Sequence, residues 1–260
     1  MPTRIYSRKN RKLLLTQFFP RKPEEENDRL PPRMAEDTRL HDRIAENLSR
    51  SPLIGVVRTS RIEDAAVQAE LLSAAGVSLI EITFTVPDAP ALVRRLLAGR
   101  RAGGPPFFGM GTVTTAARAR EAVAAGAEFV VTPNVSAAVV EVVRPAGLFL
   151  VMGALTATEV VAAHEMGADL IKVYPLPPVG GPAYLATLRQ PLGDIPMLAA
   201  GGFGIEEIPA YARAGAIAFG MGSPLLLGED AEDSRRRVAR ALSFALKEPA
   251  GATEPRKENA

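Results

Sequence analysis

One lysine, Lys172, interrupts an otherwise apolar run over residues 170–174. A short run of this kind is typical of a strand in a buried parallel sheet, where an ammonium group loses hydration that the interior cannot replace. Burial favours the neutral form of an amine, and a neutral amine can attack a ketone and form a Schiff base. Lys172 is therefore a candidate nucleophile. The alternative is an edge strand whose lysine faces water.

Glu81 is the second candidate, because it lies within another apolar run, residues 78–82. Side chains of a strand alternate between its two faces, which puts Glu81 on the same face as Thr85. If both strands belong to one barrel, Glu81 and Lys172 face its interior, where a carboxylate can move protons during a reaction. The alternative is a structural ion pair of Glu81 with Lys172 or Arg58.

Short β-branched runs alternate with alanine-rich helical stretches from about residue 51 onward. Apolar strands separated by helices predict a parallel sheet that is covered on both faces. Eight of them predict an α/β fold, a closed (β/α)₈ TIM barrel in a single domain. The predicted strands are 53–57, 78–82, 106–109, 128–131, 148–151, 169–173, 195–198 and 216–219.

Several helix boundaries are marked by local patterns. The segments 60–63 (Ser-Arg-Ile-Glu) and 156–159 (Thr-Ala-Thr-Glu) predict capping boxes at helix starts. A helix over residues 37–48 is expected to close the lower end of the barrel, and the last helix is expected over 231–246. Glycines that predict left-handed helix ends are Gly76, Gly126, Gly167 and Gly215.

The chain of 260 residues divides into three predicted parts. Residues 1–36 form a basic arm, 37–248 the barrel, and 249–260 a tail. Residues 1–33 hold nine Lys or Arg against four Asp or Glu, which leaves the remainder slightly acidic. We expect the arm and the tail to be disordered rather than to bind nucleic acid. Met34, just before the first predicted helix, is an alternative translation start.

Composition excludes several classes of function. The chain has no cysteine and two histidines, so neither a metal site nor a cofactor is expected. No apolar stretch approaches the roughly 20 residues of a membrane span. The absence of cysteine does not by itself fix the compartment. We expect a cytoplasmic protein that binds a small molecule and engages neither a membrane nor nucleic acid.

Barrel active sites form at the carboxyl ends of the strands. Beyond Lys172 and Glu81, the residues predicted there are Arg58, Thr85, Thr112, Pro133 and Asn134.

Two glycine-rich turns, over residues 200–204 and 219–223, follow the last two predicted strands. Glycine lets the backbone approach a ligand closely, and amides at a helix start favour an anion. Barrels often bind phosphate at this pair of loops. The turns predict a phosphate pocket formed by Gly201, Gly202, Gly222 and Ser223.

Taken in order, these segments resemble the class I 2-keto-3-deoxy-6-phosphogluconate and 4-hydroxy-2-oxoglutarate aldolases, including the 2-keto-3-deoxy-6-phosphogalactonate aldolases. The likeness runs from about Ser51 to Leu227. The matching segments are 52–58 (Pro-Leu-Ile-Gly-Val-Val-Arg), 79–83 (Leu-Ile-Glu-Ile-Thr), 109–113 (Gly-Met-Gly-Thr-Val), 131–134 (Val-Thr-Pro-Asn), 156–159, 171–175 (Ile-Lys-Val-Tyr-Pro), 201–202 and 222–223.

The resemblance implies a metal-independent lyase, working as a homotrimer, that cleaves a 2-keto-3-deoxy-6-phospho sugar acid to pyruvate and glyceraldehyde 3-phosphate. Lys172 matches the Schiff-base lysine, and Glu81 matches the general acid and base. Thr112 and Pro133 match positions around the pyruvyl carboxylate, and Arg58 matches an arginine near the substrate. The two glycine-rich turns match the phosphate pocket.

Three positions depart from the family pattern. Thr85 replaces the arginine that phosphogluconate-type members place four residues after the glutamate. Galactonate-type members also lack that arginine and often have the Thr-Pro-Asn found at residues 132–134, so the chain resembles that type. Met152-Gly153 stands where the family has Pro-Gly, and the segment 176–179 (Leu-Pro-Pro-Val) stands where a small residue is usual. The alternatives are a 4-hydroxy-2-oxoglutarate aldolase that releases glyoxylate, a catalytically silent sugar-phosphate-binding barrel, and a phosphate-binding isomerase or thiamine-phosphate-type synthase barrel.

Overall fold

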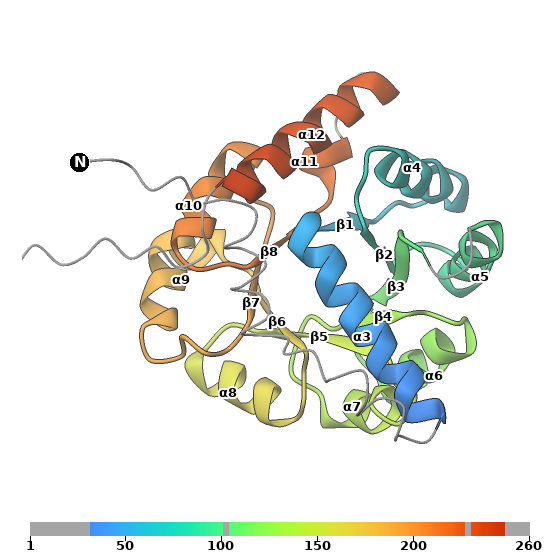
Figure 1. Cartoon of the computed structure of the whole chain (residues 1–260), viewed down its shortest axis with the longest axis horizontal. Helices are drawn as coiled ribbons and strands as arrows, with labels where there is room; N and C mark the ends of the chain where they lie inside the picture. The colour runs from blue at the N-terminus through green and yellow to red at the C-terminus, as the bar shows by residue number, and fades with distance from the viewer. Residues whose placement is uncertain (1–31, 101–103, 227–229, 248–260) are drawn as a thin grey trace, which may run out of the picture.

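The computed structural model describes residues 32–100, 104–226 and 230–247. Eight parallel strands close into a barrel in sequence order, with β1 also paired to β8 (Figure 1). The predicted (β/α)₈ barrel is confirmed. The strands are β1 Leu53–Val57, β2 Leu79–Thr83, β3 Phe107–Gly111, β4 Phe129–Val131, β5 Phe149–Ala154, β6 Leu170–Val173, β7 Met197–Ala200 and β8 Ala218–Met221.

Helices surround the barrel, and α3 crosses one of its ends (Figure 1). None of the helices in the described residues is both long and apolar enough to cross a membrane. The helices are α3 Pro32–Arg50, α4 Ile62–Ala74, α5 Ala89–Gly99, α6 Ala116–Ala124, α7 Ala137–Val143, α8 Ala157–Glu165, α9 Gly181–Arg189, α10 Ile208–Arg213, α11 Ser223–Leu226 and α12 Ala231–Lys247, with short 3₁₀ turns η1 Pro177–Val179 and η2 Ile205–Glu207.

The core has two layers, which follow the alternation of side chains along the strands. Inside the barrel, three phenylalanines at the amino ends of neighbouring strands pack with Ile44 and Leu48 of α3; they are Phe107, Phe129 and Phe149. The other face of the strands packs against the helices, and Ile171 and Val173 belong to this outer layer. The lower end of the barrel is therefore filled, as expected from a helix that covers it.

Several predicted boundaries were wrong. Strands β7 and β8 each begin two residues later than expected, and α3 begins at Pro32, inside the segment assigned to the arm. Proline suits the first turn of a helix because it has no amide hydrogen to leave unpaired. Residues 1–31 and 248–260 lie outside the described residues, so the predicted disorder of arm and tail is not tested.

One predicted capping box is present and the other is absent. Thr156 accepts from the Glu159 amide at 3.3 Å, and the Glu159 carboxylate accepts from the Thr156 and Leu155 amides, which lowers the pKa of Glu159. At the other site α4 begins only at Ile62, because the chain is still extended at Arg61, with φ −129°. Ser60 therefore precedes the position from which it could cap the helix.

Tyr211 of α10 is fully buried, and its ring centroid lies 4.3 Å from that of Phe203. Its hydroxyl has no hydrogen-bond partner among the described residues. Burial, with a smaller contribution from the charge of Glu207, raises the pKa of Tyr211 to about 12. A buried hydroxyl without a partner contributes nothing to offset its lost hydration.

We expect Tyr211→Phe to be at least as stable as the parent protein at pH 8. The matched control is Tyr184→Phe, which removes a 2.7 Å hydrogen bond to the Leu155 carbonyl and should cost about 1 kcal/mol. Above pH 10 the unfolded chain releases the Tyr211 proton while the folded chain retains it, so the parent protein should lose stability relative to Tyr211→Phe. Denaturant unfolding between pH 8 and 11 measures the free energy of unfolding of the parent protein and of both variants. Equal losses of stability in Tyr211→Phe and Tyr184→Phe at pH 8 would contradict the assignment of the Tyr211 hydroxyl as unpartnered.

Candidate active site

A cavity of about 610 Å³ opens among the carboxyl ends of β1, β6, β7 and β8. It brings together six of the residues predicted to act in the site: Arg58, Lys172, Gly201, Gly202, Gly222 and Ser223. The remaining lining residues are Val56, Gln68, Tyr174, Ala200, Gly220, Pro224 and Leu226.

Lys172 is half-buried at the centre of β6, between Gly153 of β5 and Leu198 of β7. Its Nζ lies 5.3 Å from the centroid of the Tyr174 ring, so the aromatic face lies beside the amine. Among the described residues, no carboxylate forms an ion pair with Lys172. The amine therefore reaches the cavity without being held in a salt bridge.

Glu81 lies across the barrel from Lys172, on β2 between Val56 of β1 and Gly109 of β3. It is only 2 % exposed. The side chain occupies the space that a Cβ at Gly111 would fill. In the described part of the chain its carboxylate pairs with neither Lys172 nor Arg58, so the alternative of a structural ion pair finds no support.

The residues predicted around a carboxylate lie just beyond the ends of β3 and β4. Thr112 follows β3 with φ +59°, a left-handed conformation that is uncommon for a β-branched residue. The Pro133–Asn134 backbone packs onto Gly153, where a Cβ would meet the Asn134 nitrogen at 2.7 Å. Of the described residues, these three and Glu81 are not part of the cavity lining. The structure thus gathers the predicted residues into two adjacent groups.

Thr85 is exposed and does not line the cavity. Thr83 donates to the Val57 carbonyl at 3.1 Å, and the Thr83 and Thr85 hydroxyl oxygens lie 2.7 Å apart. Because the single hydroxyl hydrogen of Thr83 is committed to Val57, Thr85 must be the donor between them. Thr85 therefore has no donor left for a substrate carboxylate.

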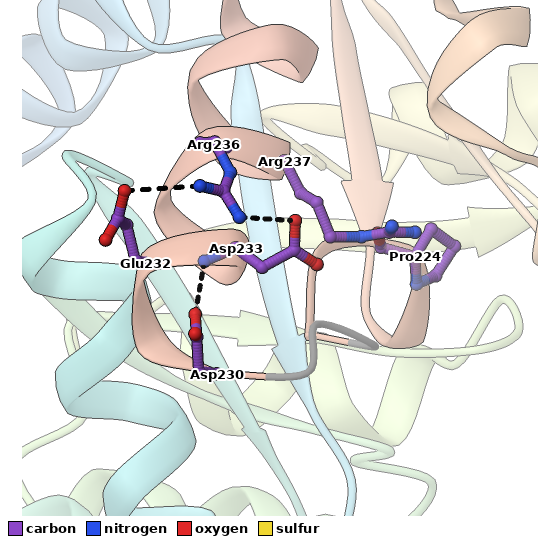
Figure 2. Close-up of polar contacts among 6 residues, drawn as sticks. All are labelled: Pro224, Asp230, Glu232, Asp233, Arg236 and Arg237. Carbon is purple, nitrogen blue, oxygen red and sulfur yellow. Dashed lines mark hydrogen bonds and ion pairs between the residues drawn. The ribbon is translucent and has the colours of Figure 1, made fainter.

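Pro224, which lines the cavity next to Ser223, is contacted by Arg237 of α12 (Figure 2). Arg237 donates from Nε to the Pro224 carbonyl at 2.9 Å, and Asp230 accepts from the Asp233 amide at the start of the helix at 2.8 Å. Arg236 turns to the opposite side and binds Glu232 at 3.2 Å. Neither Arg237 nor Gln68 of α4 was predicted from the sequence, since Arg237 reaches Pro224 and Gln68 reaches the cavity only through packing of helices.

No group of three or more His, Cys, Asp or Glu side chains that could hold a metal ion occurs in the part of the chain that the structure describes.

Comparison with known proteins decides the family. The model of the KDPG and KHG aldolases matches residues 44–239. The chain belongs to the KDPG and KHG aldolase family. The predicted enzyme class, an aldolase of the lyases, is thereby confirmed.

Two curated relatives and one solved structure illustrate the likeness. A 2-dehydro-3-deoxy-phosphogluconate aldolase of Treponema pallidum is 34% identical over 65% of this chain and 79% of its own. A probable 2-dehydro-3-deoxy-6-phosphogalactonate aldolase of Rhizobium meliloti is 32% identical over 78% and 95%. A native KDPGal structure superposes with a TM-score of 0.67 at 28% identity, over 74% and 93%.

Gly111→Ala should abolish most activity while leaving the fold intact. The added methyl group would occupy the place of the Glu81 carboxylate, which must then rotate away from the rim. We expect turnover to fall by roughly 10²- to 10⁴-fold, the usual effect of losing a general acid or base. Glu81→Gln is the control and should give a similar loss, whereas an active Gly111→Ala variant would show that the carboxylate need not occupy this place.

Proposed function

We propose that the protein is a class I aldolase that cleaves a 2-keto-3-deoxy-6-phospho sugar acid to pyruvate and glyceraldehyde 3-phosphate. The observation that carries this proposal is a lysine without a carboxylate partner, Lys172, in one cavity with two glycine-rich loops and Arg58. The names of the relatives support the same substrate class.

In the proposed reaction the Lys172 amine adds to the C2 ketone, and loss of water gives a protonated imine. The imine draws in the electron pair of the C3–C4 bond while Glu81 takes the proton of the C4 hydroxyl, which becomes the aldehyde. The enamine that remains is protonated at C3, and water releases pyruvate and regenerates the amine. Every step uses only acid, base and amine chemistry.

The phosphate is proposed to bind in the same cavity as Lys172, where Arg58 and Ser223 line the wall with Gly201, Gly202 and Gly222. Backbone amides at glycine turns and a guanidinium are both suited to a phosphate dianion. Arg58 is exposed and, within the described residues, has no acidic partner to compete with a ligand. This remote charge can position the reacting carbons.

Borohydride in the presence of pyruvate should trap a covalent adduct on Lys172, because reduction fixes the imine as a stable amine. Mass spectrometry of the digested protein measures the site. Lys172→Met should form no adduct and release no pyruvate. Release of pyruvate by the parent protein with no adduct, or with the adduct on another lysine, would overturn the Schiff-base mechanism.

Phosphorylated 2-keto-3-deoxy acids should exceed 4-hydroxy-2-oxoglutarate in kcat/KM by at least about tenfold, or about 1.4 kcal/mol of transition-state binding. Arg58→Gln should reduce this preference, whereas Arg61→Gln, which changes a surface arginine paired with Glu63, should not. Equal rates on the two substrates would favour the 4-hydroxy-2-oxoglutarate aldolase. If no 2-keto acid released pyruvate, the silent sugar-phosphate-binding barrel would be the correct assignment.

We also infer a homotrimer in the cytoplasm, which is supported by the family to which the chain belongs. Light scattering should then give about three times the 27.6 kDa of one chain.

A further inference from the structure

Arg118 is a partly buried cation at the rim that the reaction outlined above does not use. It lies in the first turn of α6, where its amide donates to the side chain of the helix cap Thr115 at 3.2 Å. Its guanidinium turns back over the rim. NH1 donates to the Thr112 carbonyl at 3.1 Å and to the Thr114 hydroxyl at 3.2 Å.

The same guanidinium bridges the loops that follow β2 and β3. Its central carbon lies 5.3 Å from the centroid of the Phe84 ring, between Thr83 and Thr85, while NH1 holds Thr112. These loops follow the two strands that carry Glu81 and Gly111. Arg118 thus lies over the strands that carry Glu81 and Gly111, and Arg58 lies in the cavity with the glycine-rich loops.

Arg118 contacts the backbone at Thr112, where the conformation is strained. Thr112 is one of two non-glycine residues with positive φ among the described residues, the other being Asp88. Such a conformation costs free energy and persists where neighbouring contacts hold it. Arg118 binds the carbonyl of this residue, and the amide of Val113 donates to the Val131 carbonyl at 3.2 Å. Together the two contacts hold the turn from both sides.

The charge of Arg118 is available to a ligand. Within the described residues no carboxylate forms an ion pair with it, and NH2 and Nε make no hydrogen bond to protein atoms. Its hydrogen bonds go only to uncharged oxygens. Thr85, next to Phe84 in the β2 loop, has its hydroxyl hydrogen committed to Thr83. The rim beside Thr112 therefore offers one unneutralised cation.

We propose that Arg118 binds the carboxylate of the 2-keto acid and holds Thr112 in the conformation that the bound carboxylate requires. This inference rests on the proposed function, since it assumes that a 2-keto acid condenses with Lys172. It assigns the two anionic ends of the substrate to two different arginines, with Arg118 at the carboxylate and Arg58 at the phosphate.

The test compares an anionic ketone with a neutral one. Borohydride trapping on Lys172 is measured as a function of the concentration of pyruvate or of methyl pyruvate, for the parent protein, Arg118→Gln and Arg118→Lys. Glutamine retains a neutral donor for the Thr112 carbonyl, and lysine retains the charge. The matched control is Arg120→Gln, an exposed arginine two residues further along α6.

We expect Arg118→Gln to raise the half-saturating concentration of pyruvate roughly tenfold, as loss of a charge-assisted hydrogen bond predicts, and to leave that of methyl pyruvate within about twofold. Arg118→Lys should recover part of the loss, and Arg120→Gln should behave like the parent protein.

If Arg118→Gln changed the half-saturating concentrations of pyruvate and methyl pyruvate equally, the proposal would be overturned and Arg118 would be a structural residue of the turn. No change for either compound would also overturn the proposal. If the parent protein itself forms no adduct on Lys172, the proposed function fails instead, and the two failures are thus told apart.

Discussion

The volume available inside the barrel is the constraint on which the rest of this structure depends. Eight strands leave an interior that side chains can fill completely. At the lower end they do so, with three phenylalanines and the apolar face of α3. At the upper end, glycines at Gly111, Gly153 and Gly222 leave out side chains that would collide with Glu81, the Pro133 backbone and the Val56 carbonyl. A rigid base thus supports a hollowed rim.

This division of volume explains how a charged strand residue can be tolerated. Lys172 follows Leu170 on the inner face of β6, so its amine rises from the filled layer into the cavity. It is half-buried rather than buried, and the ring of Tyr174 borders it in place of a carboxylate. An aromatic face attracts a cation weakly without committing it to an ion pair. The amine is thus accommodated at modest cost and stays accessible to a ketone.

Local patterns in the sequence predicted the features that depend on neighbouring residues alone. Alternation along the strands assigned Ile171 and Val173 to the outer layer and Lys172 to the inner one, and glycines such as Gly76 and Gly215 marked left-handed helix ends. The ends of strands were predicted less accurately. Strands β7 and β8 each end two residues later than predicted, where glycine-rich turns begin that propensity alone assigns to loops. The Ser60 box was wrong because a capping pattern does not reveal how far an extended segment continues.

Contacts between distant elements could not be predicted in this way. Arg237 reaches the Pro224 carbonyl because α11 and α12 pack together, and Gln68 reaches the cavity only because α4 packs on β1 and β2. Arg118 is instructive, since only six residues separate it from Thr112. Its contact depends on the left-handed turn at Thr112. The sequence of residues 112–115, Thr-Val-Thr-Thr, does not predict such a turn.

The positions of the cations constrain which molecules the rim can hold. Arg58 lies in the cavity among the glycine-rich loops, and Arg118 lies across the rim, against the loops that follow β2 and β3. Lys172 lies on β6, in the wall between β5 and β7. On the proposed assignment, the substrate must carry one anionic group for each arginine and a ketone that reaches Lys172. A 2-keto acid with a distal phosphate meets that requirement, because its ketone is adjacent to the carboxylate and its phosphate is several carbons away.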